Sequence, residues 1–158
     1  MNKGFSLIEL LVVVAIIGIL AAAGSVAYTG FIENSKEKVC IQNHKLVTKM
    51  VMTNYYKCQS SQTIVLREQF TNGKMGKEKN LSCNHNFATI AGETVKSFGN
   101  YAKSPYENLS YNIPILSYLG APPMDGGISY YAHNNNHNTS RIRSKCNGKI
   151  LDDILQGG

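Results

Sequence analysis

The first part of the chain is dominated by one long run of apolar side chains. No charged residue occurs between Leu10 and Ile32, a stretch of 23 residues. A helix of that length is about 34 Å long, enough to cross a hydrocarbon core of about 30 Å. Lys3 precedes the run, where a basic residue favours a cytoplasmic N-terminus. Glu9 lies at the start of this apolar block. Inserting a carboxylate into a membrane costs about 2.5–3.5 kcal/mol, so Glu9 is expected to have a function. Its cationic partner is expected to come from another molecule, because the apolar segment contains no cation.

From Glu33 to Tyr56 the pattern becomes amphipathic, because apolar residues recur at steps of three and four. The predicted stripe comprises Val39, Cys40, Asn43, Leu46, Val47, Met50, Val51 and Tyr55. Five lysines lie largely off it and indicate a solvated face rather than a nucleic-acid patch: Lys36, Lys38, Lys45, Lys49 and Lys57. Neither glycine nor proline occurs from Phe31 to Gln59. The pattern predicts one helix of about 50 residues, with its first half in the membrane and its second half against a globular head.

Beyond this helix the pattern predicts short elements. Thr63–Phe70 fits a strand or a loop, and residues 72–86 form a polar connection. Phe87–Ala91 and Thr94–Phe98 fit two strands around Gly92, although one helix suits the same residues almost equally well. Leu109–Leu119 is apolar but contains Pro114, which restricts it to an edge strand or an irregular loop.

The clearest hairpin joins Gly127–His133 to Thr139–Cys146 through the turn residues Asn134–Asn138. Ile150–Leu155 is expected to add a final short element. The predicted fold class is therefore α+β, in which a long N-terminal helix packs its second half on a small antiparallel sheet.

Residues around the start of the apolar run carry a specific motif. Gly4 is followed by Phe5, then by the polar Ser6, two apolar residues and Glu9, and then by the uncharged helix. A secretory signal peptide has its small-residue cleavage site after the apolar region and a shorter apolar region. Here the small residue comes first, so the segment resembles the type IV pilin family, in which a short basic leader ends in glycine.

This resemblance implies how the N-terminus is processed and used. A prepilin peptidase would cut between Gly4 and Phe5 and methylate the new amino group of Phe5. In a filament, Glu9 would face the Phe5 amine of a neighbouring subunit. The implied partners are further copies of the chain as a homopolymer, the inner membrane, the peptidase and a pilus assembly platform. Val26 and Ala27 stand where many family members have proline.

The expected domains are a leader (1–4), a membrane and assembly helix (5–32), its amphipathic continuation (33–57) and a β-rich head (58–158). Small residues such as Gly18, Ala22 and Gly24 would let apolar helices approach closely. The expected location is a single-pass inner-membrane protein before assembly, and an extracellular filament afterwards.

Four cysteines in a domain outside the membrane indicate two disulfides. Cys40 and Cys58 would lie about 27 Å apart on a continuous helix, beyond the roughly 7 Å Cα limit of a disulfide. Two connectivities remain: Cys40–Cys83 with Cys58–Cys146, and Cys40–Cys146 with Cys58–Cys83. The second is preferred, because it closes the connection leaving the helix and ties the C-terminal strand back to it.

Composition and motifs favour a structural role. The side chains carry a formal net charge of +6, which suits an anionic partner and a soluble surface alike. The chain lacks the motifs of a nucleophile elbow, phosphate loop, metal site or cofactor site, so neither an enzyme nor a cofactor is predicted. The first hypothesis is a pilus filament subunit for adhesion, motility or DNA uptake.

Two alternatives remain open. One is a minor pilin that binds DNA through a cationic face of alternating residues, Arg141, Arg143 and Lys145, together with Lys149. The other is a pseudopilin of a type II secretion machine, which would share the same N-terminal motif.

Overall fold

The computed structural model describes residues 6–68, 76–99, 104–106, 115–116, 125–132 and 137–158. The chain divides into two units, Met1–Ser35 and Lys36–Gly158, which are taken in turn. The long helix α1, Leu7–Ser60, begins in the first unit and continues in the second.

The first unit is helical from Leu7 onward, and its large apolar side chains are exposed on every side. In the described part of the chain, α1 is the one helix that is long and apolar enough to cross a membrane. A helix suits that environment because it satisfies its backbone hydrogen bonds internally. The predicted membrane-length helix is therefore present.

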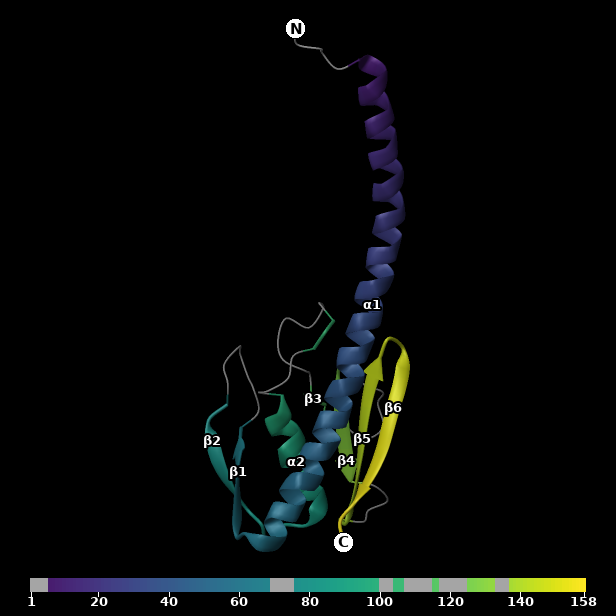
Figure 1. Cartoon of the computed structure of the whole chain (residues 1–158). Helices are drawn as coiled ribbons and strands as arrows, with labels where there is room; N and C mark the ends of the chain where they lie inside the picture. Colours follow the sequence, from purple (N-terminus) through teal and green to yellow (C-terminus); the bar gives the residue numbers. More distant parts are fainter. Residues whose placement is uncertain (1–5, 69–75, 100–103, 107–114, 117–124, 133–136) are drawn as a thin grey trace. The chain divides into compact units, whose positions relative to one another are not determined.

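The second unit contains α1 from Lys36, a short helix and two sheets (Figure 1). β1 (Thr63–Arg67) pairs antiparallel with β2 (Glu78–Ser82). The other sheet has the order β3-β4-β5-β6, from Ile115–Leu116, Ile128–Ala132, Thr139–Cys146 and Lys149–Gln156. The pairs β4–β5 and β5–β6 are antiparallel, whereas β3 runs parallel to β4. The α+β class is confirmed, with one short parallel pair that the prediction lacked.

The core of the second unit lies where α1 and the short helix α2 (Phe87–Phe98) meet the sheets. It contains Val47, Val51, Tyr55, Ile64, Leu66, Leu81, Phe87, Ile90, Ala91, Val95, Phe98, Ile128 and Ile142. Alternation along β5 directs Ile142, Ser144 and Cys146 inward and its arginines outward. The hairpin of β4 and β5 thus presents one face to the helices, as its alternating pattern predicts.

The amphipathic stripe predicted for α1 agrees only in part with the residues that are buried. Val47 and Val51 are fully buried, but Val39 and Leu46 are 43% and 46% exposed. The buried face instead includes the polar residue His44, and also Asn54, whose amide donates to Thr94 Oγ1 at 3.2 Å. Burial of these polar groups depends on partners from other elements, which the helical period does not reveal.

Residues 87–98 form a helix, so the alternative of two strands around Gly92 is wrong. Asn86 caps this helix, and its side chain accepts a hydrogen bond from the Thr89 backbone N–H at 2.9 Å. A Cβ at position 92 would lie 2.5 Å from Cε2 of Tyr130 on β4, so a larger residue there would force this ring to shift. The residue that weakens the helix in sequence terms therefore allows the helix to approach the sheet.

One further prediction needs correction, and the predicted final element is confirmed with longer bounds. The polar connection 72–86 contains β2, whose one buried residue is Leu81. The final element is an eight-residue strand, β6, joined to β5 by Asn147-Gly148, both at positive φ. Asn-Gly is the preferred pair for a tight two-residue hairpin turn. Most of 109–119, and residues 133–136 of the β4–β5 connection, lie outside the described residues.

Neighbouring strands offer a matched test of this packing. Ile142 of β5 is fully buried, while Ile154 of β6 is 53% exposed. Ile142→Ala is expected to lower the free energy of unfolding by about 2–5 kcal/mol, and Ile154→Ala by no more than about 0.5 kcal/mol. Denaturant unfolding of the detergent-solubilised chain, followed by near-ultraviolet circular dichroism, measures both. Equal losses from the two variants would contradict the assigned inner face.

Candidate processing and assembly site

Ser6 and Glu9 form a reciprocal cap at the start of α1. The Ser6 backbone N–H donates to Glu9 Oε2 at 2.8 Å, and the Glu9 backbone N–H donates to Ser6 Oγ at 3.3 Å. This is the capping box of a Ser-x-x-Glu sequence, which satisfies two N–H groups at a helix start. The N-terminal end of a helix also favours negative charge. Glu9 therefore has a partner in its own chain, a role that the sequence analysis missed although Ser-x-x-Glu signals it.

The cleavage site itself is not part of this description. Gly4 and Phe5 lie outside the described residues. Ser6, the first residue of the capping box, directly follows Phe5, the predicted mature N-terminus. The predicted processing and assembly residues thus occupy one continuous segment of the sequence, Gly4 to Glu9.

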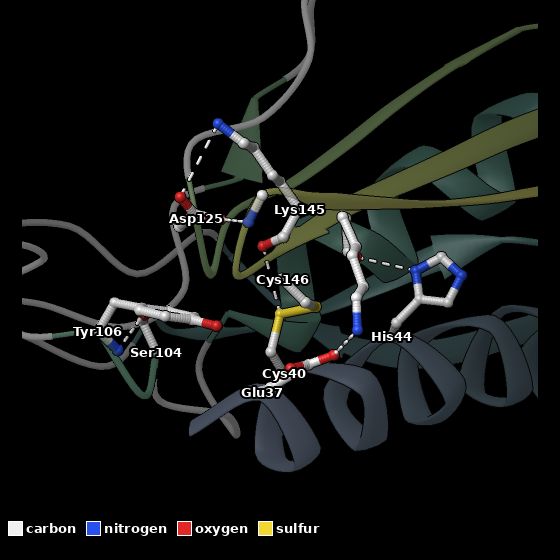
Figure 2. Close-up of a disulfide and its surroundings, with 11 residues drawn as sticks. Glu37, Cys40, His44, Ser104, Tyr106, Asp125, Lys145 and Cys146 are labelled. Carbon is white, nitrogen blue, oxygen red and sulfur yellow. Dashed lines mark hydrogen bonds and ion pairs between the residues drawn. A yellow bond between two sulfur atoms is a disulfide. The ribbon is translucent and has the colours of Figure 1, made fainter. Parts of the chain in front are cut away.

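Two disulfides connect elements of the second unit, Lys36–Gly158, which is called the head from here on. Cys40 on α1 bonds to Cys146 at the end of β5, with a Cα–Cα distance of 5.7 Å (Figure 2). Cys58 in the last turn of α1 bonds to Cys83 after β2, with a Cα–Cα distance of 5.0 Å. This is the connectivity preferred from the sequence. All four cysteines are used, and none is free.

The β5–β6 turn is held beside α1 by more than the Cys40–Cys146 disulfide. Lys149 Nζ lies 2.6 Å from Glu37 Oε1 on α1, and the Gly148 backbone N–H donates to Asp125 Oδ1 at 2.9 Å. The ammonium of Lys149 lowers the pKa of Glu37 below its ordinary value. In Figure 2, Asp125 lies across from Lys145, with their charged atoms 3.8 Å apart.

The outer face of β5 carries the predicted cations, but they are not free. Arg141 and Arg143 share Asp152 of β6, with Nε–oxygen distances of 2.6 Å and 3.0 Å. Hydrogen bonds from Arg141, and then Arg143, lower the pKa of Asp152 against the opposing effect of burial. Both guanidinium groups also lie about 6 Å from the ring centre of Tyr131, at 6.0 and 5.8 Å.

Every predicted anion-binding cation therefore has a carboxylate partner within the head. Asp152 serves both arginines, Asp125 serves Lys145, and Glu37 serves Lys149. Four cations face three carboxylates, so little positive charge remains for a polyanion. The sequence alone does not reveal this pairing, because the register of β6 places Asp152 opposite Arg143.

A buried histidine links α1 to the sheet. His44 Nδ1 lies 2.8 Å from Ser144 Oγ on β5, and its Nε2 lies 3.1 Å from Asp153 Oδ2 on β6 (His44 is labelled in Figure 2). A carboxylate only accepts, so Nε2 carries the proton and Nδ1 accepts from the Ser144 hydroxyl. Ser144 is 1% exposed. Ser144, His44 and Asp153 thus form a hydrogen-bonded series in which the serine hydroxyl is closed to a substrate. The series links α1 to β5 and β6.

Within the residues that the structure describes, no three histidine, cysteine or acidic side chains lie together in a way that could hold a metal ion.

Together these features describe a membrane-anchored precursor: a long apolar N-terminal helix that continues into a small, disulfide-bonded α+β head. A family model for the prokaryotic N-terminal methylation motif matches residues 1–25. The chain thus carries the signature of type IV pilin-like prepilins, which indicates a structural protein and implies processing by a prepilin peptidase. No curated protein and no solved structure matches the chain.

The buried His44 is expected to make the free energy of unfolding depend on pH. Burial lowers its pKa below 6.5 and outweighs the opposing attraction of Asp153. The unfolded chain therefore binds a proton first as the pH falls through 6.5, so stability is complete above this pH and declines below it, by at most about 1.4 kcal/mol per pH unit for one proton. The pKa values of the Glu37, Glu93 and Asp152 carboxyl groups are also lowered. The stability that these carboxylates contribute is lost only below about pH 4.5, so it does not contribute to the decline that begins at pH 6.5.

Unfolding titrations between pH 7.5 and about 5 should show this decline in the wild type and a flatter profile in His44→Gln. The exposed His85 provides the matched control variant, His85→Gln. Identical slopes in all three proteins would show that His44 does not titrate on unfolding in this range.

Proposed function

We propose that the chain is the structural subunit of a type IV pilus, which polymerises through its N-terminal helix into a surface filament. The observation that carries this proposal is the methylation motif at residues 1–25, which runs directly into an exposed apolar helix. A helix that is apolar on every side needs either lipid or other apolar helices around it. The membrane and a bundle of identical helices would provide these environments in succession.

Transfer from lipid to such a bundle changes the burial of apolar surface little, because lipid tails are as apolar as the side chains. Close approach of small residues, such as Gly18 and Ala22, and the pairing of charges would then favour assembly. Cleavage before Phe5 would create the cation for that pair, an amino group one residue before Ser6. We infer that Glu9 of one subunit pairs with the Phe5 amine of its neighbour.

The capping box refines this assembly step. In the single subunit the Glu9 carboxylate accepts from the Ser6 N–H at 2.8 Å, so it is not left without a partner before assembly. Entry into the filament would add or exchange a partner rather than bring together an unsatisfied ion. This supports a role for Ser6 in positioning Glu9.

The head has the features of a domain that folds outside the cytoplasm. Its two disulfides connect α1 to β5 and to the segment after β2. Adhesion, motility and DNA uptake are the three roles that such a surface filament could serve. DNA binding through Arg141, Arg143, Lys145 and Lys149 receives less support, because each has a carboxylate partner. A pseudopilin would share the N-terminal motif and is distinguished by the absence of a surface filament.

Processing is tested on protein from filaments sheared off the cells. Mass spectrometry is expected to find Phe5 as an N-methylated first residue, because the peptidase removes residues 1–4. Gly4→Leu should keep Met1 and remain in the membrane fraction, since a side chain is added at the cleaved bond. Filaments built from wild-type protein that still begins with Met1 would contradict the proposed processing.

Assembly is tested with three replacements of Glu9, each expressed as the sole pilin. Glu9→Gln keeps a side chain that serves at this position of a capping box but removes the charge. Loss of one member of a buried ion pair costs about 3–5 kcal/mol, so Glu9→Gln and Glu9→Ala should both be processed yet scarcely assembled, with Glu9→Asp intermediate.

The readout is the ratio of filament to membrane protein on immunoblots of sheared fractions. Wild-type filament yield from Glu9→Gln, together with loss from Glu9→Ala, would show that capping rather than charge pairing is what assembly requires.

A further inference from the structure

The two disulfides of the head differ sharply in their access to solvent. Cys40 and Cys146 are 3% and 1% exposed. Cys58 and Cys83 are only half-buried. They also line a polar pocket of about 410 Å³, together with Ser61, Gln62, Ser82 and Asn84. A hydrophilic reagent can therefore reach one disulfide of the folded head and not the other.

We propose that Cys58–Cys83 is the site at which the folded head exchanges its disulfide with a dithiol. A thiolate of the dithiol attacks one of the two sulfurs and forms a mixed disulfide, while the other cysteine leaves as a thiolate and takes a proton from water. The second thiol of the dithiol then attacks the mixed disulfide. The dithiol becomes a disulfide, and Cys58 and Cys83 become two thiols; the reverse sequence reoxidises them.

The other disulfide is closed to this reaction while the head is folded. Cys40 Sγ lies 3.3 Å from the Lys145 carbonyl oxygen, a contact rather than a hydrogen bond because a disulfide sulfur has no proton. The adjoining turn is held by Glu37 against Lys149 and by Asp125 against Gly148. A thiolate would reach Cys40–Cys146 only after the β5–β6 hairpin had left α1.

The head is expected to stay folded when Cys58–Cys83 is open. This disulfide joins the last turn of α1 to the residue after β2, and its two half-buried cysteines pack against a core that also draws residues from α2, β4 and β5. Ile64, Leu66 and Leu81 also hold the β1–β2 pair by burial. Exchange at this site is therefore local, and the same access makes it the disulfide that an oxidising partner can complete after folding.

Timed reduction of the full chain in detergent micelles tests the proposal. The protein is treated with dithiothreitol or with reduced thioredoxin, quenched with N-ethylmaleimide and mapped by mass spectrometry. Cys58 and Cys83 should become alkylated roughly tenfold faster than Cys40 and Cys146, or more, with an unchanged near-ultraviolet spectrum while only the first pair is open. Reduction of Cys58–Cys83 by both reagents would show that protein dithiols can exchange with it. Reduction by dithiothreitol alone would restrict the exchange to small dithiols.

Matched variants separate access from intrinsic reactivity. The remaining disulfide should open slowly in Cys58→Ser/Cys83→Ser and quickly in Cys40→Ser/Cys146→Ser, and in denaturant above the unfolding midpoint the two rates should converge. Equal rates in the native protein, earlier opening of Cys40–Cys146, or loss of the folded spectrum as Cys58–Cys83 opens would each overturn the proposal. None of these outcomes depends on filament formation, so the test is independent of the proposed function.

Discussion

The packing of one face of α1 against the sheet is the interaction on which the head depends. Val47 and Val51 are completely buried there, and Cys40 is bonded to Cys146 of β5. The same helix is apolar on every side before Ile32 and on one side only after Lys36. That change of pattern separates a segment suited to lipid or other helices from one that can nucleate a core in water. α2 and the four-stranded sheet also pack on each other, and the buried face of α1 completes the core that all of them share.

Polar groups within this interface restrict how helix and sheet fit together. His44 reaches Ser144 and Asp153, while Asn54 reaches Thr94 of α2. Apolar contacts tolerate a shift of position, but each of these groups needs a partner in one place, because an unpaired buried polar group costs about 1–3 kcal/mol. Small side chains on the inner face of β5, Ser144 among them, let the helix approach closely. Burial thus supplies stability, and the hydrogen bonds favour a single arrangement.

Much of this architecture could be predicted from the sequence, for identifiable reasons. The helical period and the absence of glycine and proline predict α1, and alternation predicts the β4–β5 hairpin. Helix geometry alone excludes Cys40–Cys58. Other features depend on tertiary context. Leu81 is the one buried residue of β2, too little for an alternating signal, and Gly92 is explained only by the ring of Tyr130. Asn147-Gly148 signals the tight turn and Ser6-x-x-Glu9 signals the capping box, so both features can be read from the sequence alone.

The structure also alters the physical account of the candidate assembly residue. An acid at the start of an apolar helix suggests an ion that waits for a partner, yet Glu9 already accepts a hydrogen bond from Ser6. A subunit in the membrane therefore does not carry the full cost of an unpaired charge. Under the proposed function, pairing with the Phe5 amine of a neighbour competes with the cap or adds to it. The free energy gained on assembly is then smaller than the cost of breaking an established pair, about 3–5 kcal/mol, because the starting state is partly satisfied. Such a moderate gain at each subunit would keep addition to the filament reversible, and the many weak contacts of the small side chains along the helix would supply the remainder.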